Sequence, residues 1–173
     1  MNPLSGSGGN KAVTIEFKAL PQTAAEFSAL PQAAMQTPFE TAAMFVAAMC
    51  LYPQNSAEAI QMINSLKGPQ PLSPYDKQFL ADRMRGKDYL PKSFFVGATP
   101  DNGYTPAQPY KITVSENPYS YQEQGYAKLF LQSGGADSPR PIQLRLAKDG
   151  KWYLWEQFLL SDIRIPSAAD PWA

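Results

Sequence analysis

Two alternating segments joined by the dipeptide Asp149-Gly150 restrict the possible folds of this chain more than any other part of its sequence. Apolar and polar residues alternate over residues 142–147 and again over residues 152–158. An Asp-Gly pair between two such segments is the strongest short-range indication of a β-hairpin, because glycine accepts the positive φ that tight hairpin turns require. The pattern therefore predicts an antiparallel sheet, whose apolar face must be covered by other elements.

The upstream half of the chain supplies helices that can cover this sheet. Thr37 and Ser73 each precede a proline and stand three residues before an acidic residue, which is the pattern of a capped helix N-terminus. Apolar residues at helical spacing follow both positions and also mark residues 55–67. We therefore expect three helices, with a further turn or two of helix within residues 23–30.

The remaining strand-like segments complete an α+β domain. They lie at residues 13–17, 94–96, 110–115 and 126–132. We expect about three N-terminal helices packed on a curved antiparallel sheet, in a single domain over residues 13–173. The Gly/Ser-rich start, residues 1–12, is expected to be a flexible leader.

Two registers of the hairpin are open. A two-residue turn pairs Leu146 with Tyr153, whereas a three-residue turn with Gly150 in a bulge pairs Leu146 with Trp152. A slip of one residue exchanges the face of every side chain. We favour the bulge because it gathers the apolar side chains on one face, namely Ile142, Leu144, Leu146, Trp152, Leu154 and Phe158.

In the favoured register the opposite face carries Arg145, Tyr153 and Trp155 beside Gln143 and Gln157. Amphipathic aromatic residues and arginine are enriched at protein interfaces. We therefore expect this open face to be an interface, through which two copies of the chain form a homodimer.

Glu156 falls among Trp152 and Leu154 in this register, and a carboxylate on an apolar face is costly unless it is paired or lines a cavity. In one interpretation the strand end reaches solvent there, or Arg145 or a loop amine pairs with Glu156. In the other, Glu156 is a pocket acid with a raised pKa that acts as a general base or orients a ligand. Trp152 and Tyr126 would then be further ligand-binding residues.

Composition excludes several classes of function. The 15 basic residues balance the 15 acidic ones, which leaves no basic footprint for nucleic acid or for an anionic membrane. There is no histidine, and the single cysteine, Cys50, lies in an apolar helical segment, where we expect an inert core thiol. We find no metal-binding, cofactor-binding or nucleophile motif, and therefore expect no metal and no cofactor.

No segment reaches the roughly 18 consecutive apolar residues of a membrane span. The start of the chain has neither the basic nor the apolar region of a signal peptide. We therefore expect a cytoplasmic protein.

Capped helices followed by an antiparallel meander resemble the cone-shaped, nuclear transport factor 2-like or cystatin-like folds, and that resemblance implies helices on the concave side of a bent sheet. The ending WYLWEQFLLSDIRIP, residues 152–166, resembles that of an uncharacterised bacterial family, a domain of unknown function found in clostridial-type bacteria, over about residues 37–172. Cone-fold enzymes commonly place a carboxylate or histidine base in the cone. This chain has no histidine, so we carry no catalytic role across.

These observations predict a non-catalytic binding or assembly module, homodimeric through the open sheet face, with a small-molecule or protein ligand. The alternative is a small-molecule enzyme, isomerase- or hydrolase-like, with a histidine-free conical pocket in which Glu156 accepts a proton. A roomy pocket in which Glu156 and a tyrosine converge would favour the enzyme.

Overall fold

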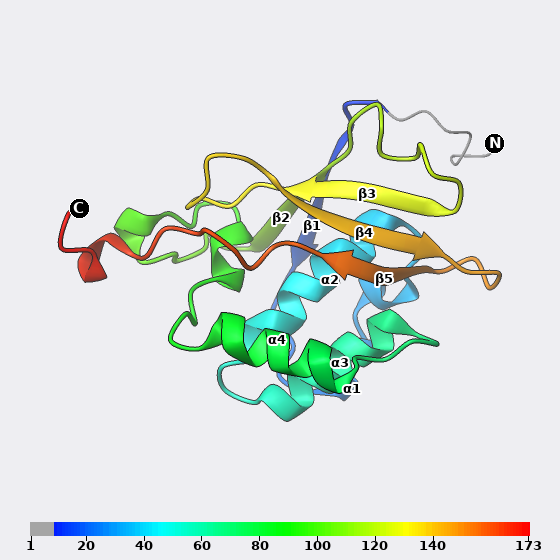
Figure 1. Cartoon of the computed structure of the whole chain (residues 1–173), viewed down its shortest axis with the longest axis horizontal. Helices are drawn as coiled ribbons and strands as arrows, with labels where there is room; N and C mark the ends of the chain where they lie inside the picture. Colours follow the sequence, from blue (N-terminus) through cyan, green and yellow to red (C-terminus); the bar gives the residue numbers. More distant parts are fainter. Residues whose placement is uncertain (1–8) are drawn as a thin grey trace.

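Five strands form one antiparallel sheet in which neighbours along the chain are also neighbours in space (Figure 1). The strands are β1 (Ala12–Phe17), β2 (Tyr110–Ser115), β3 (Tyr126–Leu131), β4 (Arg140–Leu146) and β5 (Trp152–Gln157). The computed structural model describes residues 9–173, so residues 1–8 of the expected leader lie outside the described residues. The predicted antiparallel α+β class is confirmed.

Four helices lie on one side of this sheet (Figure 1). They are α1 (Ala24–Ser28), α2 (Pro38–Leu51), α3 (Ser56–Lys67) and α4 (Pro74–Met84), with short 3-10 turns at Pro31–Ala34, Pro91–Phe94, Pro100–Asn102 and Ser167–Ala169. The count exceeds the expected three because the helical turn anticipated near residues 23–30 forms as α1. The predicted caps are confirmed: the Thr37 and Ser73 side chains accept hydrogen bonds from the third helical N–H, and both helices have full capping boxes.

Helix α2 is the centre of the core and contacts every strand of the sheet. Twelve of its 14 residues are buried, and its four alanines let the sheet and α3 approach its axis closely. Inside this packing the Thr41 hydroxyl donates a 2.6 Å hydrogen bond to the main-chain oxygen of Trp152. This buried bond ties α2 to the edge strand β5 and satisfies both polar groups.

The prediction of a short strand at residues 94–96 is wrong, because no strand forms there. Pro91 begins a 3-10 turn that ends at Phe94, and this turn carries Phe94 and Phe95 into the core. The Val96 N–H then donates to the Lys111 oxygen of β2, and the Val96 oxygen accepts from the Ala107 N–H. Gly97, at φ 89°, turns the chain away before a strand can form.

The β4–β5 hairpin forms with the favoured three-residue turn. Gly150 has φ 85°, and Leu146 pairs with Trp152. Trp152 is only 5% exposed, so the prediction that its indole is buried between sheet and helix is confirmed. A second irregularity then follows, because Leu144 pairs with Leu154 but Gln143 pairs with Glu156, one residue further along than a regular ladder allows.

This second bulge corrects two predicted orientations. Glu156 pairs with Gln143 and is exposed, so it does not share the buried face with Trp152 and Leu154. Phe158, expected on the same buried face, is 53% exposed. Both predictions were wrong because they extended the two-residue period of the strand through a position where one extra residue, Trp155, is inserted.

The opposite face of the sheet is not covered by any helix within residues 9–173 (Figure 1). Separately, none of the helices in this part of the chain combines the length and the apolar character needed to cross a membrane.

Candidate functional site

An aromatic and cationic group lies on the open face of the sheet. The Arg145 guanidinium lies 4.7 Å from the ring centroid of Trp155 and 5.4 Å from that of Tyr126. The two rings meet edge to face, with their centroids 5.8 Å apart. Strand pairing places Tyr126, Arg145 and Tyr153 opposite one another on β3, β4 and β5. We call Tyr126, Arg145, Tyr153 and Trp155 the Arg145 cluster.

Tyr153 is held in place from two sides. Its hydroxyl donates a 2.7 Å hydrogen bond to the Asp149 carboxylate in the hairpin turn. This bond lowers the pKa of Asp149 and raises that of Tyr153. On the other side the ring lies against Gly68 at the end of α3, where an added Cβ would be 2.5 Å from a ring carbon. Contacts within the chain therefore hold Tyr153 in position.

The residues predicted to form an interface are thus brought together. Arg145, Tyr153 and Trp155 share one surface, and Tyr126, predicted as a ligand-binding residue, joins them there. Their role in an interface stays a prediction.

A groove of about 300 Å³ lies beside this cluster, between α4 and β5. Tyr75 and Phe79 line it from α4, and Leu154 and Phe158 line it from the β5 side. Trp155 belongs both to the groove and to the cluster. Tyr75 is 78% exposed, so one wall of the groove presents an aromatic surface to solvent.

The charged residues of this α4–β5 groove do not form a catalytic arrangement. Asp76 accepts a hydrogen bond from the Ser73 N–H as part of the α4 cap, and Lys67 donates to the main-chain oxygen of Trp155 at 3.4 Å. Within residues 9–173, no hydrogen bond or ion pair involves the exposed Glu156 carboxylate. A tyrosine therefore shares the groove with Glu156 without being bonded to it.

The three residues predicted to hold a ligand are not brought together. Trp152 is buried on the inner face, Tyr126 lies on the outer face, and Glu156 is at the rim of the groove. The sequence could not separate them, because the bulge at Trp155 leaves no mark on the alternation of apolar and polar residues.

Cys50 lies at the end of α2 and is half-buried. Burial raises the pKa of its thiol to about 12, an effect that the nearby Lys92 charge partly opposes. The thiol is therefore protonated at neutral pH and is a poor nucleophile. Within residues 9–173, acidic, cysteine and histidine side chains nowhere gather in a group of three that could hold a metal ion.

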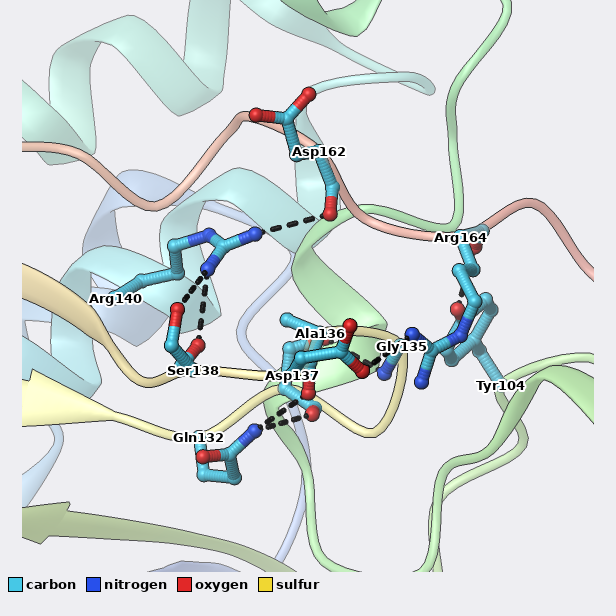
Figure 2. Close-up of polar contacts among 10 residues, drawn as sticks. Tyr104, Gln132, Gly135, Ala136, Asp137, Ser138, Arg140, Asp162 and Arg164 are labelled. Carbon is cyan, nitrogen blue, oxygen red and sulfur yellow. Dashed lines mark hydrogen bonds and ion pairs between the residues drawn. The ribbon is translucent and has the colours of Figure 1, made fainter.

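Away from the Arg145 cluster, a group of polar contacts fixes the segment after β5, which contains Asp162 and Arg164, to the rest of the chain (Figure 2). The Arg140 guanidinium donates to the main-chain oxygens of Ser138, Ser161 and Asp162 at 2.9 to 3.1 Å. Since these acceptors are carbonyl groups of two chain segments, Arg140 acts as a clamp between them.

Nearby contacts strengthen the same junction. Arg164 pairs with Asp137 at 2.9 Å, and its main-chain oxygen accepts a hydrogen bond from the Tyr104 hydroxyl (Figure 2). Tyr104 is fully buried and stacks on Tyr89, with ring centroids 5.4 Å apart. Sequence reasoning missed this cluster because its members are far apart along the chain and follow no local pattern. Its donors are used internally, so we assign it a structural role.

Comparison with known proteins places the chain in one family. The model of the family described as "Domain of unknown function (DUF6935)" matches residues 19–167, most of the chain. No curated protein and no solved structure matched. The expected resemblance to a family of unknown function is confirmed, and the chain belongs to the DUF6935 family.

Proposed function

We propose that this domain is a non-catalytic protein-binding module that assembles as a homodimer through the open face of its sheet. The observation that carries the proposal is the Arg145 cluster, an arginine held against a tryptophan and a tyrosine on a face that no helix within residues 9–173 covers. Tryptophan, tyrosine and arginine are the residues that most often dominate binding energy at protein interfaces.

The cluster is suited to binding because its side chains already have partners within the chain. Asp149 and Gly68 fix Tyr153, and the two flanking rings hold Arg145. Side chains that are fixed before association lose less conformational entropy when a partner covers them.

The charges beside the cluster suit a second copy of the chain. Lys128, Gln143 and Glu156 lie opposite one another across three strands, with a cation at one end and a carboxylate at the other. In a dimer with a two-fold axis, residue i of one copy meets residue j of the other, and the reverse contact follows by symmetry. An axis near Gln143 would therefore bring Lys128 of each copy to Glu156 of the other. The net charge of zero adds no repulsion between copies.

The proposed architecture is a cone-like fold of the nuclear transport factor 2 type. It is supported by the meander order of the strands and by α2, which lies across all five of them on one side. The enzyme alternative has weaker support: Tyr75 lines the same groove as Glu156, but Glu156 is exposed, Trp152 is buried on the inner face, and no hydrogen bond within residues 9–173 joins Glu156 to a tyrosine.

Analytical ultracentrifugation at micromolar concentration tests the proposal. We expect the wild-type chain to sediment as a dimer and Arg145→Glu to sediment as a monomer. Arg85→Glu makes the same charge change at an exposed arginine beyond α4 and should leave the dimer intact.

Charge exchange sharpens this test. Lys128→Glu should weaken the dimer by placing two carboxylates opposite each other, and adding Glu156→Lys to that variant should restore it. A monomeric wild-type chain, or an Arg145→Glu variant that dimerises normally, would contradict the proposed interface.

A further inference from the structure

A polar cavity of about 530 Å³ lies apart from the Arg145 cluster and from the α4–β5 groove. Its walls come from the segment after β1, the C-terminal end of α2, the turn at Pro91–Phe94 and the loop that leads into β2. It shares no lining residue with the groove. Its volume is within the range of small-molecule sites, roughly 300 to 1,000 Å³.

The charge of this cavity is one-sided. Lys18 and Lys92 line it, and no aspartate or glutamate does. This is unusual for a chain whose acidic and basic residues are equal in number. Two cations in a concave site raise the local concentration of anions.

Hydrogen-bond donors in the cavity are available for a ligand. Gln54 and Gln108 contribute side-chain amides beside the two lysines. In the part of the chain that the structure describes, residues 9–173, no hydrogen bond or ion pair engages these four side-chain nitrogens. Amide and ammonium donors are the groups that bind oxyanions, and bonds to a charged partner are about twice as strong as neutral ones.

Two groups beside the cavity do not neutralise the positive charge of Lys18 and Lys92. The Cys50 thiol lines the cavity and stays neutral, because burial raises its pKa to about 12. The last carbonyls of α2, which would repel an anion, are partly occupied: the Leu51 oxygen accepts hydrogen bonds from the N–H groups of Gln54 and Asn55 at 3.0 and 2.9 Å.

The cavity also offers apolar surface. Leu20, Pro21 and Pro106 line it, as does Tyr110, whose ring packs edge to face on Phe95 at 5.7 Å. A ligand can therefore place a charged group at the lysines and an organic group on this wall.

We propose that this cavity binds a small organic anion, whose phosphate or carboxylate group is held by Lys18 and Lys92 and whose organic part packs on Leu20, Pro21 and Pro106. The proposal is independent of the homodimer.

Titrations followed by NMR of the amide groups test this site. The probes are phenyl phosphate and benzoate, with uncharged benzyl alcohol as the matched control. We expect at least one anion to give saturable shifts that centre on Lys18, Cys50, Lys92 and Gln108, and benzyl alcohol to bind more weakly. The better anion identifies which oxyanion the site prefers.

Variants separate the site from general salt effects. Lys18→Gln and Lys92→Gln should each weaken binding roughly tenfold, as expected for loss of one charged hydrogen bond. Lys92→Arg should retain binding because it retains the charge. Lys77→Gln, at an exposed position on α4, should change nothing, and amide spectra that overlay the wild type confirm that each variant is folded.

Shifts that never saturate, equal binding of benzyl alcohol, or unchanged affinity in both glutamine variants would overturn the proposal.

Discussion

The inner and outer faces of the sheet are made by alternate residues of the same strands, yet they are chemically different. On the inner face Ile112, Leu129 and Leu144 are fully buried beneath the helices. On the outer face Thr14 and Thr113 share a 3.2 Å hydrogen bond, and Arg145 stacks on aromatic rings. Within residues 9–173 the helices cover the inner face, and the outer face is uncovered except where Tyr153 lies against Gly68 at the end of α3.

This difference separates what stabilises the domain from what is free to bind. Close packing makes the inner face sensitive to any change of volume. The outer face keeps exposed or half-exposed side chains, so substitutions there should affect association more than folding. Three predictions test this division, in order of decreasing effect on stability.

The largest expected effect is at Trp152. Trp152→Ala should lower the free energy of unfolding by about 3 to 5 kcal/mol, because it removes a buried indole and leaves a cavity. Trp155→Ala, on the outer face, is the matched control and should cost less than about 1 kcal/mol. Urea unfolding at low protein concentration measures both without a contribution from assembly. Similar losses in the two variants would remove the distinction between the faces.

A smaller and pH-dependent effect is expected at Tyr153. Tyr153→Phe removes the hydrogen bond that lowers the pKa of Asp149 in the folded state. Because the pKa of Asp149 is lower in the folded state than in the unfolded chain, its hydrogen bond stabilises the fold at pH values above the unfolded pKa of about 3.9. This stabilisation is lost as the pH falls through the folded pKa. The stability difference between wild type and variant should therefore shrink in acid.

Denaturant melts at neutral pH and at successively lower pH values measure this difference. Tyr75→Phe, at an exposed tyrosine on α4, is the control and should show no such trend. A wild-type advantage that grows in acid would show that Asp149 does not fix the outer-face tyrosine.

The smallest effect is expected at Glu156. Because the second bulge turns this residue to solvent, Glu156→Gln should change stability by less than about 0.5 kcal/mol in the monomer. Thermal or urea melts at neutral pH are sufficient. A clear stabilisation by glutamine would mean that the carboxylate is buried, and it would restore the pocket-acid interpretation.

Local patterns in the sequence predicted much of the fold. The caps at Thr37 and Ser73 and the turn at Gly150 depend on residues within a few positions of each other, so they can be recognised without tertiary contacts. The alternation on either side of that turn also predicted that Trp152 is buried and that Arg145 and Trp155 share the outer face.

The candidate sites were less predictable because they join distant segments. The polar cavity brings Lys18 to Lys92, and the clamp brings Arg140 to the main chain of Asp162. No spacing rule connects such positions, since the folded path of the intervening chain decides which side chains meet.

Short-range sterics, hydrogen bonding and periodicity set the capped starts of α2 and α4, the hairpin turn and the apolar face of β4, so these features follow from the sequence alone. The orientation of Glu156, in contrast, depends on contacts between distant parts of the fold. Lys67 and Gly68 of the α3 end lie against β5 beside the inserted Trp155, and the bulge there reverses the alternation. A bulge inserts one residue into a strand and leaves no mark on the local sequence pattern. The bulge at Trp155 is accompanied by a hydrogen bond from Lys67 of α3, some 90 positions away along the chain, and a local pattern cannot predict such a contact.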